Sequence, residues 1–294
     1  MTGAWPSRKP NQAVIASIIG NIIEYYDFVI YAYFSASIGR TFFPDNWPLS
    51  QIGLSLATFG LTLLARPLGA IILGNYADRR GRVSTMMVCI LLMAIGSLLI
   101  TLTPSYQDIG IAAPALIILA RLLHGFSLGG EFGSATSYLI EHAPRHEARA
   151  ASWQAIGQIT ASLCAAVVVL ALQLTLSPAI FDTFGFRIAT GLGAAAGISG
   201  LILRMMLTPE NSEIPARPHS APTPFLQPDT LLRTALIMGS VALGSGITYL
   251  GLYMPHYARS QYSLSSLTTS LAPLLTYGGK LLFTPIPWKL ADRF

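Results

Sequence analysis

Charged side chains are scarce in this chain, and their scarcity narrows the class of protein. Asp, Glu, Lys and Arg together supply 11% of the 294 residues, whereas 52% are hydrophobic. Soluble globular domains carry charge at about a quarter of their positions. The composition therefore excludes an ordinary water-soluble domain and predicts an integral membrane protein.

Cysteine is also nearly absent, since the chain holds only Cys89 and Cys164. Both lie inside apolar runs, so they form no disulfide framework and do not identify a redox compartment. We expect them to be small hydrophobic residues buried among helices.

Catalytic and metal-binding motifs are missing as well. His142 and His146 are four residues apart, but Pro144 separates them and no third ligand is near, which argues against zinc. The glycines between residues 125 and 133 follow no strand, so a phosphate-binding loop is not expected. With no Ser-His-carboxylate arrangement either, the sequence predicts a protein that is not an enzyme and holds no metal and no cofactor.

Long apolar runs are what the chain has in abundance. A helix needs about 20 mostly apolar residues to cross a bilayer. Eight segments meet this need: 13–36, 52–73, 84–103, 111–140, 151–174, 185–206, 231–257 and 265–287. Glu24 and Asp27 interrupt the first segment and no small-residue cleavage site follows it, so we expect a retained helix rather than a signal peptide.

Basic residues between these segments predict the orientation. Alternate loops collect most of them on one side: Arg8, Lys9, Arg79, Arg80, Arg82, Arg145, Arg149, Arg204, Arg217, Arg233, Lys289 and Arg293. The other side receives Arg40, Arg187 and Arg259. Cytoplasmic loops are enriched in Lys and Arg, so the N-terminus is predicted to be cytoplasmic. Because topology explains these charges, we expect no nucleic-acid partner.

A proline-rich stretch divides the chain. Six prolines fall between residues 209 and 228, among polar residues that cannot continue a helix. We therefore predict an all-α membrane protein with a six-helix bundle over residues 1–207, a cytoplasmic linker over 208–230 and two further helices over 231–294.

Several charged residues fall inside the predicted spans: Glu24, Asp27, Arg66, Arg121, Glu131 and Lys280. Charges at bilayer depth are unfavourable, so they usually face the interior of a bundle and mark a pathway. Glu24 and Asp27 share a helical face with Asn21 and Tyr31. A carboxyl group away from water favours its protonated form, so this face can carry protons. The alternative is structural, as an ion pair with Arg66 or Arg121 or as a helix-packing hydrogen bond.

Arg121 lies about ten residues into the fourth span, close to the bilayer centre. Its guanidinium is suited to bidentate capture of a carboxylate, unless it pairs with Glu24 or Asp27 instead. Arg66 lies nearer the cytoplasmic side, so a structural or gating role competes with substrate contact. His124 and Glu131 are seven residues apart on one face, which permits a proton relay, although membrane histidines are more often packing residues.

Two further patterns concern helix faces. Gly125, Gly129 and Gly133 recur every four residues and predict a smooth stripe for close helix packing. Tyr249 and Tyr253 lie on one face of the seventh span, which faces either a substrate cavity or the membrane interface.

Residues 74–82 read Gly-Asn-Tyr-Ala-Asp-Arg-Arg-Gly-Arg, between two predicted spans. This short hairpin resembles the signature loop between the second and third helices of the major facilitator superfamily. Ala291-Asp292-Arg293 is a partial echo, at a distance that fits a parallel repeat of about 200 residues. Complete members have twelve helices. The resemblance therefore implies the major facilitator fold, with a complete N-terminal six-helix bundle and the first two helices of the C-terminal bundle, in a chain truncated at Phe294.

Other segments are similar to the metabolite:H+ symporter branch of this superfamily. They are Gly-Asn-Ile-Ile-Glu-Tyr-Tyr-Asp-Phe at 20–28, Phe-Phe-Pro at 42–44, Arg-Pro-Leu-Gly at 66–69 and the run from Arg121 to Glu131. Residues 106–154 are especially similar to the α-ketoglutarate, citrate and tricarballylate transporters of that branch. Gly185-Phe186-Arg187-Ile188-Ala189 departs from the usual Gly-Trp-Arg-Ile-Pro.

The resemblance implies proton-coupled symport of a small carboxylate across the bacterial inner membrane by alternating access, driven by the proton gradient. Its partners are a small organic acid, H+ and the lipid bilayer, and a full-length protein is expected to be monomeric. The implied roles are substrate binding by Arg121, Arg66, Tyr31, Tyr249 and Tyr253, proton coupling by Glu24, Asp27, Glu131 and His124, and gating by Gly74, Asp78, Arg79, Gly81, Arg82, Asp292 and Arg293.

Two alternatives stay open. The cargo is a zwitterionic osmolyte such as proline or betaine, as in some members of the branch. Otherwise the chain is a non-functional remnant, because six helices facing two would expose polar groups to lipid.

Overall fold

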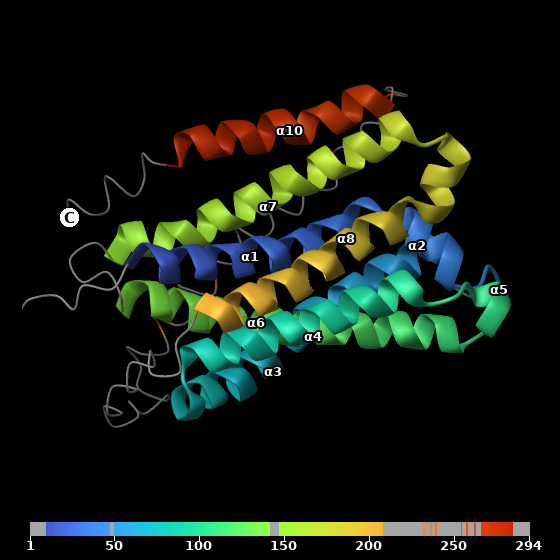
Figure 1. The fold of residues 1–294 in the computed structure, drawn as a ribbon. Helices are drawn as coiled ribbons and strands as arrows, with labels where there is room; N and C mark the ends of the chain where they lie inside the picture. Colours follow the sequence, from blue (N-terminus) through green and yellow to red (C-terminus); the bar gives the residue numbers. More distant parts are fainter. Residues whose placement is uncertain are drawn as a thin grey trace, which may run out of the picture.

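The computed structural model describes residues 10–47, 50–141, 147–207 and 266–284, together with Leu232, Leu236, Gly239, Met254, Tyr257 and Tyr262. All regular elements in these residues are α-helices (Figure 1). The long ones are α1 (Pro10–Tyr33), α3 (Gln51–Arg80), α4 (Arg82–Leu102), α6 (Ala112–Glu141), α7 (Glu147–Thr175), α8 (Pro178–Leu207) and α10 (Ser266–Phe283). The short ones are α2 (Ser35–Phe42) and α5 (Tyr106–Ile109).

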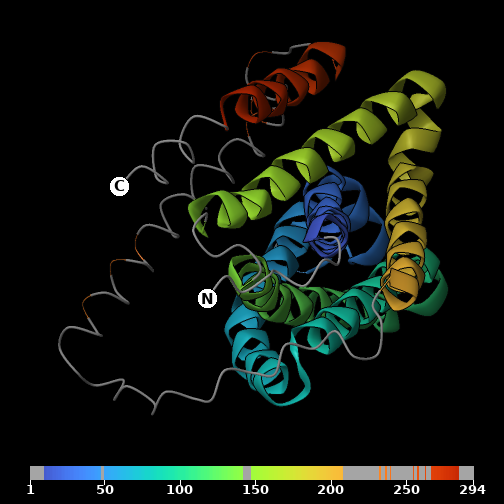
Figure 2. The same cartoon turned by 60° about the vertical axis from the view of Figure 1, so that its left-hand side comes forward.

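Two groups of packed helices build the bundle. Helix α1 packs against α7 and α8, while α6 packs against α3 and α4, and α4 also joins α8 (Figure 2). Helix α10 lies along the outside of α7. The turn between α3 and α4 lies at one end of the bundle, which we call the basic end, and α2 and α5 lie at the opposite end.

Apolar side chains cover the outside of the bundle. Five described helices are long and apolar enough to cross a membrane, namely α3, α4 and most of α6, α7 and α8. On α3, Leu64 is 72% exposed and Ile71 is 63% exposed, whereas Thr58, Thr62 and Gly69 are buried. Helices with large apolar residues outside and small or polar residues inside are expected where lipid is the solvent.

Six long helices up to Leu207 agree with the six spans predicted there, and α10 agrees with the eighth. The proline-rich linker and almost all of the predicted seventh span lie outside the described residues. One boundary is wrong in the first span: α1 ends at Tyr33, and α2 begins at Ser35 as a separate short helix.

The hairpin predicted over residues 74–82 is also wrong in its secondary structure. Helix α3 continues to Arg80, and Gly81 alone separates it from α4 with a φ of 94°. Thirty residues span about 45 Å, longer than the roughly 30 Å of bilayer hydrocarbon. The last turns of α3 therefore extend past the apolar layer, and there Asp78 of α3 forms an ion pair of 2.9 Å with Arg82 at the start of α4.

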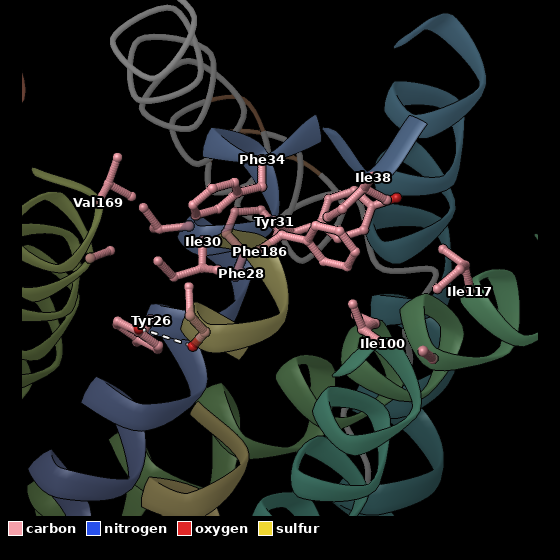
Figure 3. Close-up of a cluster of buried hydrophobic side chains, with 14 of the residues drawn as sticks. Tyr26, Phe28, Ile30, Tyr31, Phe34, Ile38, Ile100, Ile117, Val169 and Phe186 are labelled. Atoms are coloured by element: carbon pink, nitrogen blue, oxygen red, sulfur yellow. Dashed lines mark hydrogen bonds between the residues drawn. The ribbon is translucent and has the colours of Figure 1, made fainter. Parts of the chain in front are cut away.

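A cluster of buried hydrophobic side chains fills the bundle toward the opposite end. Phe28 and Tyr31 of α1, and Phe34 between α1 and α2, lie near Ile117 of α6 and Phe186 of α8 (Figure 3). Tyr26 donates a hydrogen bond from its hydroxyl to the carbonyl of Ala189 across 3.1 Å, so α1 is tied to α8 beside this cluster.

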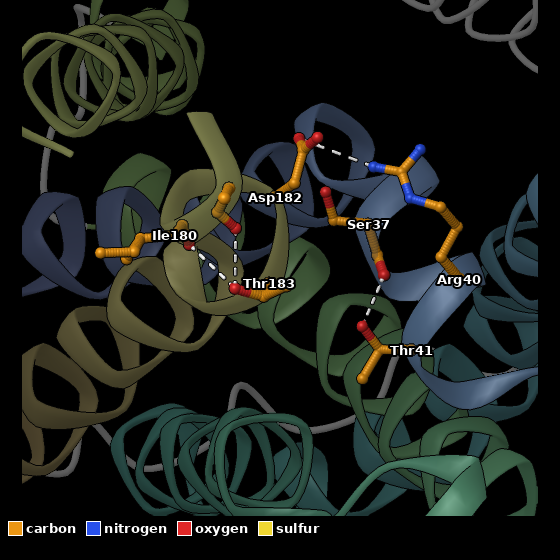
Figure 4. A network of polar contacts seen from close by, with 7 residues as sticks. Ser37, Arg40, Thr41, Ile180, Asp182 and Thr183 are labelled. Atoms are coloured by element: carbon orange, nitrogen blue, oxygen red, sulfur yellow. Dashed lines mark hydrogen bonds and ion pairs between the residues drawn. The ribbon is translucent and has the colours of Figure 1, made fainter. Parts of the chain in front are cut away.

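At that end, polar contacts join the short helices to the bundle. Arg40 of α2 and Asp182 of α8 form an ion pair of 3.6 Å, with both side chains about half exposed (Figure 4). Such a pair contributes about 0–1 kcal/mol. Ser105 donates two hydrogen bonds to Asp108 at the start of α5, and these lower the pKa of the Asp108 carboxyl.

A close helix crossing joins α3 and α6 through glycine. A methyl group on Gly125 would lie against the carbonyl of Thr62, and one on Gly129 against the carbonyl of Arg66. From the other side, Gly69 lies against the carbonyl of Phe126. Backbones this close leave no room for a Cβ atom. The predicted glycine stripe is thus confirmed at its first two positions and wrong at Gly133, which has nothing within 4 Å.

The crossing gives a matched pair of substitutions. We expect Gly129→Ala to lower stability by about 1–3 kcal/mol, because the new methyl group forces α3 and α6 apart. Gly133→Ala adds the same methyl group on the same helix without a clash and should leave stability equal or slightly higher, since alanine is the better helix former. Thermal unfolding in detergent micelles measures both. Equal melting temperatures for the two variants would contradict the tight crossing.

Candidate functional site

Buried polar residues of the bundle are concentrated on α1 and α6, which run antiparallel. Seven of them form a set that we call the polar ladder: Glu24, Asp27 and Tyr31 of α1 with Arg121, His124, Ser127 and Glu131 of α6. None is more than 3% exposed. Tyr31 lies level with Arg121, and Glu24 level with Ser127. Spacings of three and four residues on both helices therefore keep the polar groups in register.

Arg121 occupies the level nearest the opposite end. Its guanidinium lies over the ring of Tyr31, 4.0 Å from the centroid, and 5.4 Å from that of Phe59. Tyr31 is itself held by Thr58, at 2.5 Å between the two hydroxyl oxygens. These ring contacts are cation–π interactions, which are stronger when desolvated.

One edge of the Arg121 guanidinium is anchored and another is open. Nη1 lies 3.1 Å from Nδ1 of His124. Nε and Nη2, which together form the edge that binds a carboxylate in bidentate fashion, have no hydrogen-bond partner among the described residues. The arginine is 0% exposed. It is thus a cation held in place, with two donors available to an anion once the site opens.

Asp27 occupies the next level. The hydroxyl of Ser97, from α4, donates to its Oδ2 and also lies 3.2 Å from Nε2 of His124. The other oxygen, Oδ1, has no hydrogen-bond partner in the described part of the chain. Gly193 of α8 makes room for this carboxyl group, because a Cβ atom there would lie 2.7 Å from its Cγ.

Glu24 and Glu131 occupy the level nearest the basic end. Ser127 donates to Oε1 of Glu24 across 2.6 Å, and the same hydroxyl lies 2.8 Å from the carbonyl of Cys89. Glu24 also interacts electrostatically with Glu131 and Arg66. Two carboxyl groups in one buried site repel each other when both are ionised.

Arg204 brings a second positive charge to this level, beside Glu131. A Cβ atom on Gly20 would lie 2.8 Å from Oε1 of Glu131 and 3.0 Å from Nη2 of Arg204, so both side chains abut the bare backbone of α1. Arg204 was counted above as a loop cation, and that count is wrong: it is 3% exposed, in the last turn of α8. A buried carboxylate attracts the nearest guanidinium, which overrides the tendency of loops to hold the basic residues.

The structure brings most of the predicted site residues together. Glu24, Asp27, Tyr31, Arg121, His124 and Glu131 all belong to the ladder, and Arg66 lies beside it with its guanidinium 4.9 Å from the ring of Phe28. Within the described ranges, neither Arg66 nor Arg121 forms an ion pair with Glu24 or Asp27. His124 and Glu131 contact different partners, at separate levels.

Other predicted residues lie elsewhere. Gly74, Asp78, Arg79, Gly81 and Arg82 lie at the basic end, at the junction of α3 and α4. Tyr249, Tyr253, Asp292 and Arg293 lie outside the described residues, as do His142 and His146. Among the described residues, no group of three His, Cys, Asp or Glu side chains could hold a metal ion.

Sequence reasoning missed Ser97, Ser127, Gly193 and Arg204. Ser127 was detectable, because it follows Arg121 and His124 at helical spacing on a polar face. Ser97 and Gly193 gave no signal, since a lone serine or glycine in an apolar run is common in membrane helices.

An apolar exterior around a ladder of buried charges defines a multi-pass membrane protein of the transporter class. Comparison with family models agrees: the model described as "Sugar (and other) transporter" matches residues 12–212. This chain belongs to that family, within the major facilitator superfamily.

Relatives of known activity extend the comparison. The chain is 34% identical over 286 residues to a citrate-proton symporter of Salmonella typhi, covering 96% of this chain and 66% of that protein. It is 31% identical over 301 residues to a proline/betaine transporter of Escherichia coli K12, covering 97% and 60%. The chain thus spans slightly less than two thirds of the length of these relatives.

Solved structures share the fold. The proton:xylose symporter XylE bound to 6-bromo-6-deoxy-D-glucose aligns with a TM-score of 0.76 at 15% identity, covering 99% of this chain and 70% of that one. A partially occluded inward-open form of the xylose transporter from E. coli gives 0.71 at 17% identity. The expected major facilitator fold is confirmed.

The tight space around Asp27 can be tested with a second matched pair of substitutions. We expect Gly193→Ala to displace the Asp27 carboxyl group and lower stability by about 1–3 kcal/mol. Gly191→Ala lies two residues away on α8, where a Cβ atom meets Thr101 only at an ordinary 3.5 Å, and should be tolerated. Melting temperatures in detergent compare the two. If Gly191→Ala proves as harmful as Gly193→Ala, α8 does not form a specific pocket for Asp27.

Proposed function

We propose that this chain is, or forms part of, a proton-coupled symporter of small organic carboxylates that works by alternating access. Arg121 is the substrate ligand, with Arg66 and Tyr31 beside it. Asp27, Glu24 and Glu131 carry the coupled protons, and His124 belongs to the same proton-linked group. The energy source is the proton gradient, with no bound cofactor.

One observation carries the proposal: a fully buried arginine with an open Nε and Nη2 edge. A guanidinium at bilayer depth is unfavourable unless something compensates it. Aromatic rings and one imidazole nitrogen satisfy part of Arg121, and a substrate carboxylate would satisfy the rest. Citrate, proline and betaine, after which these relatives are named, all possess a carboxylate.

Access to Arg121 requires movement. Since the side chain is 0% exposed, a substrate reaches it only after helices around the polar ladder separate. The proposed gate is the junction of α3 and α4, where Gly74, Asp78, Arg79, Gly81 and Arg82 lie. Its Asp78–Arg82 ion pair is partly exposed, so rearranging it costs little.

The proposed location is the bacterial inner membrane, with the N-terminus and the basic end cytoplasmic. Support comes from Arg79, Arg80 and Arg82 at that end, because cytoplasmic ends are enriched in basic residues. For a full-length protein we propose a monomer.

A zwitterionic osmolyte is the second candidate substrate. The rings of Phe28, Tyr31 and Phe59 surround the Arg121 guanidinium. Rings of this kind also pack against quaternary ammonium groups, so a betaine could place its carboxylate on the arginine and its cation on an aromatic face. Competition of labelled citrate uptake by excess betaine separates the two substrates.

Uptake by proteoliposomes containing this chain tests the proposal. We expect radiolabelled citrate or α-ketoglutarate to accumulate when an inward proton gradient is imposed, and not without it. Arg121→Ala should reduce uptake by at least about 100-fold, because a buried carboxylate contact is worth roughly 3 kcal/mol or more. Arg40→Ala is the control, since Arg40 is exposed in a surface ion pair far from the ladder.

Two results would oppose the proposal. Uptake that survives Arg121→Ala would remove this arginine from the substrate site. Failure of a correctly inserted chain to move citrate, α-ketoglutarate or betaine would favour the non-functional remnant, and the same assay on a protein that includes the remaining helices of the relatives would then decide the substrate.

A further inference from the structure

Three hydrogen-bonded contacts connect Arg121 to Asp27 without a direct ion pair between them. Arg121 Nη1 lies 3.1 Å from His124 Nδ1, His124 Nε2 lies 3.2 Å from Ser97 Oγ, and Ser97 Oγ contacts Oδ2 of Asp27. The chain of contacts runs from α6 through α4 to α1. All four side chains are at most 3% exposed, so water does not compete with these contacts.

The chemistry of the donor groups fixes the direction of these hydrogen bonds. An arginine nitrogen only donates, so Nδ1 of His124 must accept and the imidazole is neutral with its proton on Nε2. Nε2 then donates either to Ser97 or to the carbonyl of Met93, 3.1 Å away. The Ser97 hydroxyl is left to donate to the carboxylate of Asp27. When Nε2 donates to Ser97, every donor therefore points from the cation toward the anion.

We propose that His124 and Ser97 are positioning residues that make the protonation state of Asp27 control the availability of Arg121 to substrate. This inference rests on the proposed function and deepens it. No proton travels along the chain, because arginine does not release one and His124 keeps its proton on Nε2. Asp27 instead affects Arg121 by polarising the hydrogen bonds between them and by changing side-chain positions.

The two states of Asp27 act on the chain in opposite ways. An ionised carboxylate draws the Ser97 hydroxyl, polarises the His124 ring and holds the guanidinium in the chain. A protonated Asp27 becomes a donor itself, so the Ser97 hydroxyl turns to the carbonyl of Met93, 3.1 Å away on its own helix. The pull on Nη1 of Arg121 then weakens, so the guanidinium can turn its Nε and Nη2 edge toward a substrate carboxylate. The proton therefore binds first and the substrate second.

The other groups near Asp27 act on it through electrostatics or leave it space, so the proposed coupling falls to the hydrogen bonds through Ser97 and His124. Arg121 acts on Asp27 electrostatically from α6, and Tyr26 does so from α1 itself. Helix α8 presents the backbone of Gly193, which brings no charge. Among the described residues of α4, Ser97 is the one that donates a hydrogen bond to this carboxyl group. Glu24 and Glu131 belong to the next level, with their own partners.

The pH dependence of substrate affinity tests the coupling. If one proton is linked to binding, the Kd of wild-type protein for radiolabelled citrate should rise about tenfold per pH unit above the transition. Ser97→Ala and His124→Gln should still bind citrate, but with a change of about threefold or less per unit, and should exchange substrate without gradient-driven accumulation. Ser97→Thr keeps a hydroxyl and should restore the wild-type dependence.

Ser162→Ala is the matched control, because it also removes a buried hydroxyl, but one whose partners, the carbonyl of Gln158 on its own helix and the side chain of Tyr277 on α10, lie outside the polar ladder. It should retain the full dependence on pH. If Ser97→Ala also retains the full pH dependence of citrate affinity, the proposed positioning role of Ser97 is overturned. Loss of all citrate binding in Arg121→Ala alone distinguishes the substrate ligand from the positioning residues.

A measurement without substrate separates this inference from the proposed function. Nitrogen NMR of the His124 ring, assigned by its loss in His124→Gln, should report the neutral Nε2–H tautomer between about pH 5.5 and 8. Asp27→Asn should shift these resonances, and the shift should vanish in the Ser97→Ala background. A doubly protonated His124 ring, or a shift that persists in the Ser97→Ala background, overturns the proposed positioning role of His124 and Ser97, whether or not citrate is transported.

Discussion

Burial of charge between α1 and α6 is the constraint on which the rest of this structure depends. A charged group at bilayer depth costs a few kcal/mol unless protein groups take over the role of water. Serines, an imidazole, aromatic rings and a second guanidinium take over that role here, from three neighbouring helices. The bundle is therefore organised around its polar interior, while the apolar side chains face outward.

Glycine makes this organisation sterically possible. Gly125 and Gly129 bring α6 against α3, which places Tyr31 and its partner Thr58 beside Arg121. Gly193 and Gly20 act differently, since they leave room for the Asp27 carboxyl group and for the Glu131 and Arg204 side chains. Gly125 and Gly129 thus set the distance between two helices, whereas Gly193 and Gly20 leave space for charged side chains.

The two ends of the ladder differ in chemistry. Toward the end that holds α2 and α5, Arg121 has aromatic neighbours and a donor edge without a hydrogen-bond partner among the described residues. Toward the basic end, the carboxyl groups of Glu24 and Glu131 interact with each other, and Arg204 lies close to Glu131. Asp27 lies between these two levels and is connected to Arg121 by hydrogen bonds through Ser97 and His124. In the proposed mechanism, substrate and protons therefore bind at neighbouring but separate levels of the ladder.

Much of the architecture could be predicted because each membrane helix requires a long run of apolar residues, which is easily recognised in a sequence. Apolar runs of bilayer length predicted six helices up to Leu207, and the positions of Glu24, Asp27, Arg121 and Glu131 within them predicted a shared polar interior, where the structure buries all four. Boundaries were less accurate where polar residues can remain helical. Residues 74–82 were assigned to a loop because they are charged, yet α3 continues to Arg80 since its backbone bonds are satisfied outside the apolar layer as well as inside it.

The sequence by itself determined the class of protein, the spans and the set of buried charges, because hydrophobicity and helical period are local properties. Only the tertiary structure decided how those charges are paired. Glu24 and Asp27 are one turn apart on α1, yet one meets Ser127 of α6 and the other meets Ser97 of α4. Arg204 looked like a loop cation and is buried beside Glu131. Such pairings join residues far apart in the chain, and they follow from how helices cross and where a missing Cβ leaves space, which no local pattern records.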